Sequence, residues 1–151
     1  MAGFIIRSIP RRDTAVVAVR SSLDDISDAM GEAFAKTHQA LGQAGVAADG
    51  PPFARYFSMD EPVEFEAGVT VATPFAGTAE VKPGHIGGVK AVVGMHIGPY
   101  ETLGQTYAAM TAWITSLGRT VAGPMWEIYL TDPTVEPDPK RWKTEIFIPV
   151  T

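Results

Sequence analysis

The sequence contains two copies of one short pattern, and this internal repeat constrains the fold more than any other feature. Residues 15–56 start with AVVAVR and reach GPPFARYF, and residues 91–129 start with AVVGMH and reach GPMWEIYL. A long segment of helical periodicity separates the two motifs in each copy. Such a repeat predicts two similar units, related by a pseudo-twofold axis, with a cleft at the seam between them.

Each copy predicts a strand, a long helix and two further strands. The first helix should begin after Ser21 or Ser22, which can cap it, and end near Gly42 or Gly45. The second should start at Pro99, a favourable first helical position, and stop at Gly118. The expected strands are 3–9, 14–20, 53–59, 69–75, 89–96, 125–131 and 145–150.

The connections complete the expected architecture. Residues 60–67 read as an acidic connection, and residues 76–88 as a bridge that is part loop and part edge strand. We therefore expect a single α+β domain over residues 1–151, with repeats at about 1–75 and 85–151. Its antiparallel sheet should carry both long helices on one face and a ligand cleft on the other.

Composition excludes several classes of function. The 151 residues are 46% hydrophobic, which suits one domain with a substantial core. A net charge of −5 argues against a nucleic-acid-binding face. The absence of cysteine excludes disulfides and thiolate metal sites. The three histidines lack metal-ligand spacing, no apolar stretch would span a membrane, and the N-terminus shows no signal-peptide pattern. We expect a soluble, cytoplasmic protein without metal or cofactor.

Strand 125–131 holds the main candidate residue. Alternation places Met125, Glu127 and Tyr129 on one face, and Trp126, Ile128 and Leu130 on the other. The second set is entirely apolar and should pack on the helices, which leaves the first set on the open side. The position equivalent to Glu127 in the first copy is Ala54. A single carboxylate that breaks the repeat indicates a binding or catalytic site; the alternative is an ordinary solvated strand residue.

Aromatic side chains are the next candidates. Tyr56 and Tyr129 are related by the repeat and read either as facing walls of the cleft or as ordinary sheet aromatics. Tyr100 opens the second helix, at the pocket mouth or in the core. Tyr107 lies on the apolar stripe of that helix and is expected in the core. Trp142 follows a Pro-rich loop and is a candidate lid over the cleft.

Three segments together resemble one known family. HIGPYETLGQTYAAMTAWI (96–114), GPMWEIYLTDP (123–133) and TEIFIPV (144–150) resemble the GyrI-like effector-binding domain. That domain is similar to the ligand-binding domains of MerR-type multidrug regulators and Rob-type AraC regulators. The resemblance implies two strand-helix-strand-strand units and an aromatic-lined pocket for bulky, often cationic compounds. It places Glu127 at the family's pocket glutamate. No segment is left for a DNA-binding helix-turn-helix, so we expect a stand-alone member.

The resemblance implies three functions. The leading one is a module that binds or sequesters aromatic cations, with Glu127 as charge partner and Tyr56 and Tyr129 as stacking walls. The second is a hydrolase that opens strained or electrophilic rings, with Glu127 as general acid or base and Tyr129 orienting the substrate. The third is an interaction module that restrains a topoisomerase. An unpaired sheet edge would also permit a homodimer.

Overall fold

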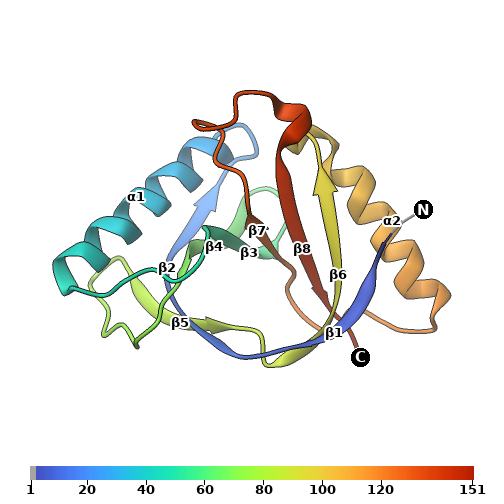
Figure 1. The fold of residues 1–151 in the computed structure, drawn as a ribbon, viewed down its shortest axis with the longest axis horizontal. Helices are drawn as coiled ribbons and strands as arrows, with labels where there is room; N and C mark the ends of the chain where they lie inside the picture. Colours follow the sequence, from blue (N-terminus) through green and yellow to red (C-terminus); the bar gives the residue numbers. More distant parts are fainter. Residues whose placement is uncertain (1–2) are drawn as a thin grey trace. The chain divides into compact units, whose positions relative to one another are not determined.

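The computed structural model describes residues 3–151, which divide into two compact units. One unit combines the described residues up to Ile9 with Val89–Thr151. The other is Pro10–Gly88. Each unit contains four strands and one long helix (Figure 1).

The unit Pro10–Gly88 is a four-stranded antiparallel sheet with one helix. Its elements are β2 (Arg12–Ser21), α1 (Ile26–Ala44), β3 (Phe53–Ser58), β4 (Val63–Thr70) and β5 (Lys82–Ile86). Within the unit the strand order is β3-β4-β2-β5, because β2 pairs with both β4 and β5. The edge strand expected within residues 76–88 is confirmed as β5.

Helix α1 packs through a narrow stripe of mostly small side chains. Its buried residues are Ala33, Thr37, Ala40 and Leu41, at helical spacings of three and four. The helix ends where Gly45 adopts φ 69°, a left-handed conformation that favours glycine. Ser22 was expected to cap the helix. Its hydroxyl instead accepts the Asp25 N–H at 3.2 Å, in a turn that precedes the helix.

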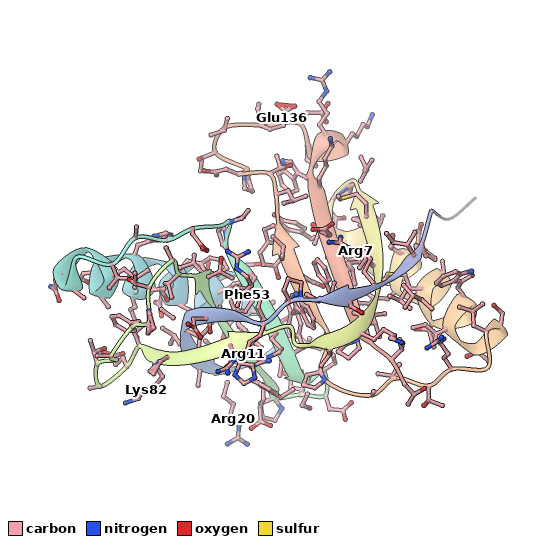
Figure 2. All side chains as sticks on the ribbon, turned by 60° about the horizontal axis from the view of Figure 1, so that its bottom comes forward. Arg7, Arg11, Arg20, Phe53, Lys82 and Glu136 are labelled. Atoms are coloured by element: carbon pink, nitrogen blue, oxygen red, sulfur yellow. The ribbon has the colours of Figure 1, made fainter. Side chains whose placement is uncertain are left out.

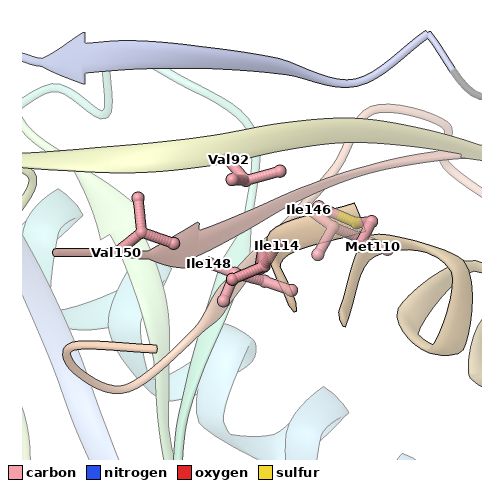
Figure 3. Packing of buried hydrophobic residues seen from close by; sticks show 6 residues of the cluster. All are labelled: Val92, Met110, Ile114, Ile146, Ile148 and Val150. Carbon is pink, nitrogen blue, oxygen red and sulfur yellow. The ribbon is translucent and has the colours of Figure 1, made fainter. Parts of the chain in front are cut away.

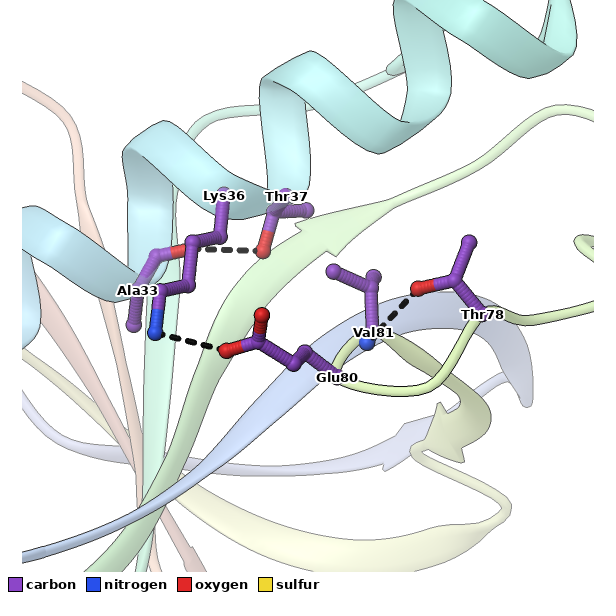
Figure 4. A network of polar contacts seen from close by, with 6 residues as sticks. All are labelled: Ala33, Lys36, Thr37, Thr78, Glu80 and Val81. Atoms are coloured by element: carbon purple, nitrogen blue, oxygen red, sulfur yellow. Dashed lines mark hydrogen bonds and ion pairs between the residues drawn. The ribbon is translucent and has the colours of Figure 1, made fainter.

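Polar contacts attach the segment before β5 to α1 (Figure 4). The Lys36 ammonium lies 2.8 Å from a carboxylate oxygen of Glu80. The Thr37 hydroxyl donates to the Ala33 carbonyl at 2.8 Å, and the Val81 N–H donates to the Thr78 hydroxyl at 3.1 Å. The Thr37 bond satisfies a fully buried hydroxyl, as burial requires.

The other unit has the same plan. Its elements are β1 (Ile5–Ile9), β6 (Val89–Ile97), η1 (Tyr100–Thr102), α2 (Leu103–Ser116), β7 (Trp126–Tyr129), η2 (Pro139–Arg141) and β8 (Lys143–Pro149). Within the unit the strand order is β1-β6-β8-β7. Pro99, the expected start of the second helix, is instead the N-cap residue of η1, and α2 begins four residues later at Leu103.

Alternate residues of β8 meet α2 in a compact apolar cluster (Figure 3). The cluster consists of Val92, Met110, Ile114, Ile146, Ile148 and Val150. Tyr107 and Met125 are partly buried side chains packed against it. Ile146 and Ile148 therefore identify the helix-facing side of β8, which is the side that positions the candidate site.

The two units share one element order, which confirms the α+β fold class. In each, a strand, a helix and two strands follow one another, and a fourth strand pairs with the first. The expected acidic connection at 60–67 and the strand at 69–75 are wrong, since β4 already begins at Val63. Val63, Phe65 and Ala67 are buried at every second position, with Glu64 and Glu66 between them. The acidic composition concealed this period-two pattern.

Among the described residues, no helix combines the length and the apolar character needed to cross a membrane.

Candidate functional site

Glu127 is a buried carboxylate on β7, with 4% of its surface exposed. Its partner across the sheet is Ile146, a member of the cluster packed against α2. Side chains of paired residues lie on the same face of a sheet. Glu127 therefore points toward α2, next to the apolar cluster.

Two tyrosines hydrogen-bond the two oxygens of this carboxylate. The Tyr107 hydroxyl, on α2, donates to Oε2. The Tyr129 hydroxyl, two residues along β7, donates to Oε1 at 2.8 Å. An ionised carboxylate only accepts hydrogen bonds, so this pair of phenol donors suits the charged form. The arrangement holds the carboxylate group in place next to aromatic rings.

The expected orientation of β7 is wrong. Met125, Glu127 and Tyr129 do share a face, but this face is turned toward α2 rather than away from it. Trp126 lies on the opposite face, where it stacks on Phe147 with ring centroids 4.9 Å apart and planes 6° apart. The apolar set 126, 128 and 130 is therefore not the helix-packing set, because an aromatic partner on β8 buries Trp126.

Tyr107 has a second role that the sequence did not indicate. It packs against the apolar cluster, as expected of a core residue, and its hydroxyl also reaches Glu127. The available signal was general: a tyrosine on a buried helix stripe needs a hydrogen-bond partner for its hydroxyl. The sequence did not identify that partner.

Three aromatic rings lie together beside this carboxylate. The rings of Tyr100 and Tyr129 meet edge to face at 5.9 Å, and those of Tyr100 and Trp142 lie 5.0 Å apart. Trp142 is held by its indole N–H, which donates to the Glu136 carbonyl at 2.7 Å. Figure 2 shows Glu136 on the loop that extends beyond β7 and β8. The structure thus groups the predicted residues Tyr100, Tyr129 and Trp142.

Burial and nearby charges both affect the pKa of Tyr100. Partial burial raises the pKa of its phenol, and the nearby carboxylates of Glu127 and Asp132 raise that pKa further. Tyr100 is still 39% exposed. Both solvent and Glu127 therefore influence Tyr100.

His96 ties the start of α2 to β6. Its Nε2 lies 3.0 Å from the Pro99 carbonyl oxygen, and its Nδ1 lies 2.6 Å from the Thr106 hydroxyl. The Thr102 hydroxyl lies 3.1 Å from the same Nε2. His96 is buried, and these contacts fix the segment that carries Tyr100.

The remaining candidates do not join this group within its own unit. Ala54 and Tyr56 lie on β3 of the other unit, where Ala54 is fully buried and Tyr56 contacts Phe65 at 5.6 Å. Their role in a ligand site stays a prediction. Met125 packs against the apolar cluster. Glu145 pairs with Ile128 and so lies on the face opposite Glu127.

The described residues contain no group of three or more histidine, aspartate or glutamate side chains arranged to hold a metal ion.

The chain matches the model of one known protein family. A family model described as the GyrI-like small-molecule-binding domain matches residues 58–151, which is more than half of the chain. No curated protein matches the chain by sequence.

Solved structures show the same fold at low sequence identity. The C-terminal domain of EcmrR superposes with a TM-score of 0.87 and 19% identity, covering 100% of this chain and 98% of that domain. The longer EcmrR chain in the EcmrR–DNA complex superposes with a TM-score of 0.85 and 21% identity. The match covers 97% of this chain, and this chain spans 56% of the EcmrR chain.

Two further neighbours carry descriptions that concern function. A protein from Listeria innocua described as a hydrolase matches with a TM-score of 0.72 and 19% identity, covering 98% of this chain and 91% of its own. SAV2435, solved with bound tetraphenylphosphonium, matches with a TM-score of 0.66 and 11% identity, covering 98% and 93%. At these identities the likeness concerns the fold.

Proposed function

Because this chain belongs to the GyrI-like small-molecule-binding family, we propose that it binds bulky aromatic cations, with Glu127 as their charge partner. The observation that carries this proposal is the buried carboxylate, whose two oxygens are held by Tyr107 and Tyr129. The tyrosines fix the position of the charge without neutralising it. A cation that displaces water at this site would be attracted more strongly than at an exposed carboxylate.

The neighbouring rings suit the rest of such a ligand. Tyr100, Tyr129 and Trp142 are already in mutual contact and offer ring faces and edges next to the carboxylate. Each ring face that meets a cation adds about 0.5–2 kcal/mol of attraction. The combination of one fixed negative charge and several rings favours large, delocalised cations over small, strongly hydrated ones.

The structural neighbours support this ligand class by analogy. SAV2435 was solved with tetraphenylphosphonium, an aromatic cation with no hydrogen-bonding group. We propose the same class for this chain because its own site supplies the charge and the rings. Sequestration of such compounds follows as the biological role.

Isothermal titration with tetraphenylphosphonium tests the charge role. We expect Glu127→Gln to weaken binding by roughly 10- to 100-fold, because the substitution keeps the side chain's shape and removes its charge. Glu145→Gln is the matched control, since that carboxylate lies on the neighbouring strand and faces the other side of the sheet. Equal affinities for wild type and Glu127→Gln would contradict the proposal.

A hydrolase is the second candidate, favoured by the hydrogen-bonded pair of Glu127 and Tyr129. With a strained, electrophilic ring compound as ligand, Glu127 would take a proton from the attacking water while Tyr129 orients the substrate. The Listeria neighbour described as a hydrolase makes this worth measuring. Mass spectrometry on the same titration mixtures distinguishes the two, because hydrolysis adds one water and simple binding leaves the compound intact.

A further inference from the structure

Thr144 on β8 carries a hydroxyl that is fully buried and has no hydrogen-bond partner among the described residues. A buried hydroxyl without a partner destabilises the folded protein, and valine would fill the same space without that cost. The Thr37 hydroxyl donates locally to the Ala33 carbonyl, whereas the buried Thr14 hydroxyl on β2, like that of Thr144, has no partner among the described residues. What distinguishes Thr144 is its position next to the carboxylate site, where a bound ligand can supply the partner.

The register of the sheet places Thr144 beside the carboxylate site. Thr144 pairs with Tyr129 on one side and with His96 on the other. It alternates with Ile146 and Ile148, so its side chain lies on the α2-facing side, as those of Glu127 and Tyr129 do. The next residue on this face of the sheet, across from Ile146, is Glu127.

Neither neighbour uses the Thr144 hydroxyl. The Tyr129 hydroxyl is directed to Glu127. Both ring nitrogens of His96 are directed to other groups: Thr106 on one side, and Pro99 and Thr102 on the other. The Thr144 oxygen therefore lies between two polar side chains whose hydrogen bonds go to other groups.

We propose that Thr144 is a second polar contact of the ligand site, which recognises a hydroxyl, carbonyl or amine group on an aromatic cation bound at Glu127. The inference rests on the proposed function and extends it to ligand selectivity. A threonine hydroxyl both donates and accepts, so it pairs with any of these groups. Ligands of this class are hydroxylated or carbonyl-bearing aromatic cations rather than purely hydrocarbon ones.

Tyr100 packs on two residues that neighbour Thr144. Its ring contacts both Tyr129, the cross-strand neighbour of Thr144, and Trp142, two residues before Thr144 on the same chain segment. Tyr100 sits on the short helix η1 and is partly exposed. This aromatic group is therefore the partly exposed part of the site that lies nearest to Thr144 in the sheet.

A matched pair of probes tests the proposal. Tetraphenylphosphonium has no hydrogen-bonding group, whereas (4-hydroxyphenyl)triphenylphosphonium adds one phenol to the same cation. We expect Thr144→Val to weaken the hydroxylated probe by roughly 3- to 10-fold more than the parent cation, as measured by calorimetric titration. Thr144→Ser, which keeps the hydroxyl, should restore the ratio of the two Kd values found for wild type.

Thermal unfolding without ligand supplies an independent readout. Thr144→Val should keep or raise the Tm, because it removes a hydroxyl that has no partner in the free protein. Thr37→Val is the control and should lower the Tm, since that hydroxyl has a partner, while leaving the ratio of the two Kd values unchanged. A lowered Tm for Thr144→Val would overturn the proposal by showing that the hydroxyl is already bonded.

The outcomes separate this proposal from the proposed function. If both probes bind and depend on Glu127, but their Kd ratio is the same in wild type and Thr144→Val, the role of Thr144 is refuted and the cation site stands. If neither probe binds the wild-type protein, the proposed function fails, and the role of Thr144 fails with it.

Discussion

Burial, nearby charges and ring packing all affect the side chain of Tyr100. It contacts Tyr129 and Trp142, and its phenol is affected by the carboxylates of Glu127 and Asp132. Burial is the largest cause of its raised pKa, and the two negative charges act in the same direction because they oppose formation of a phenolate. Tyr100 therefore reports on the state of Glu127.

An alkaline absorbance titration measures this effect. The component that Tyr100→Phe removes from the wild-type curve should titrate at higher pH than ordinary tyrosine. In Glu127→Gln the same component should move part of the way back, because only the second cause is removed. A Tyr100 component at the ordinary position in wild type would show that the phenol is neither desolvated nor near the carboxylates.

The sign of the stability effect follows from linkage. A folded-state pKa above the unfolded value means that Tyr100 contributes stability that is fully present below about pH 10 and is lost as pH rises through the folded-state pKa. Tyr100→Phe should show a smaller loss of stability over that alkaline range. Urea unfolding at two alkaline pH values measures the difference.

Individual residues also show which features of the site could be predicted from the sequence and which could not. Repeat asymmetry singled out Glu127, and the structure gives it buried surroundings and two tyrosine partners. The sequence did not identify Tyr107 as a partner of Glu127, because this contact depends on which face of β7 meets α2. Strand alternation groups residues by face, but it does not say which face a helix covers.

At the scale of elements, periodicity predicted most helices and strands. Both long helices and six of the seven expected strands correspond to elements of the structure. The sequence predicted this strand at 69–75 rather than at the position of β4, because Glu64 and Glu66 suggested a solvent-exposed connection. Their partners explain them: Glu66 pairs with Arg55 on β3, with a nitrogen–oxygen distance of 2.6 Å. A cross-strand ion pair is a property of the assembled sheet and is not visible in one strand's sequence.

The contact of α2 with β6 depends on a glycine, which leads to a prediction for these elements. A Cβ at Gly94 would lie 2.8 Å from the Met110 sulfur and 3.0 Å from the Phe4 ring. We expect Gly94→Ala to lower the free energy of unfolding by about 1–3 kcal/mol through overpacking. Urea denaturation measures this change.

Gly104 on α2 is the matched control for that substitution. A Cβ at Gly104 would meet nothing within 4 Å, so Gly104→Ala should be neutral or stabilise the protein by up to about 1 kcal/mol through helix propensity. If Gly94→Ala were as stable as Gly104→Ala, the close approach of α2 and β6 would not limit this position.

At the scale of the whole molecule, the net charge of the chain and the buried charge of Glu127 should act on different rate constants. The net charge should affect the association rate of a cation, and Glu127 its dissociation rate. The chain has 17 acidic and 12 basic residues, for a net charge of −5. This surplus acts through solvent and is screened by salt, with a Debye length of about 10 Å at 0.1 M. Glu127 is 4% exposed and should be screened much less. Attraction over distance and attraction in the site therefore respond differently to ionic strength.

Stopped-flow binding of tetraphenylphosphonium at low and high salt tests this separation. We expect the association rate to fall by roughly 2- to 10-fold between about 20 mM and 500 mM salt, because long-range steering is lost. The dissociation rate should change little, since a short-range contact with a buried carboxylate determines it. Triphenylphosphine oxide, which is similar in shape but neutral, is the control and should show no salt dependence of association. If salt instead raised the dissociation rate as strongly as it lowered association, the charge that holds the cation would be exposed, and Glu127 would not be that charge.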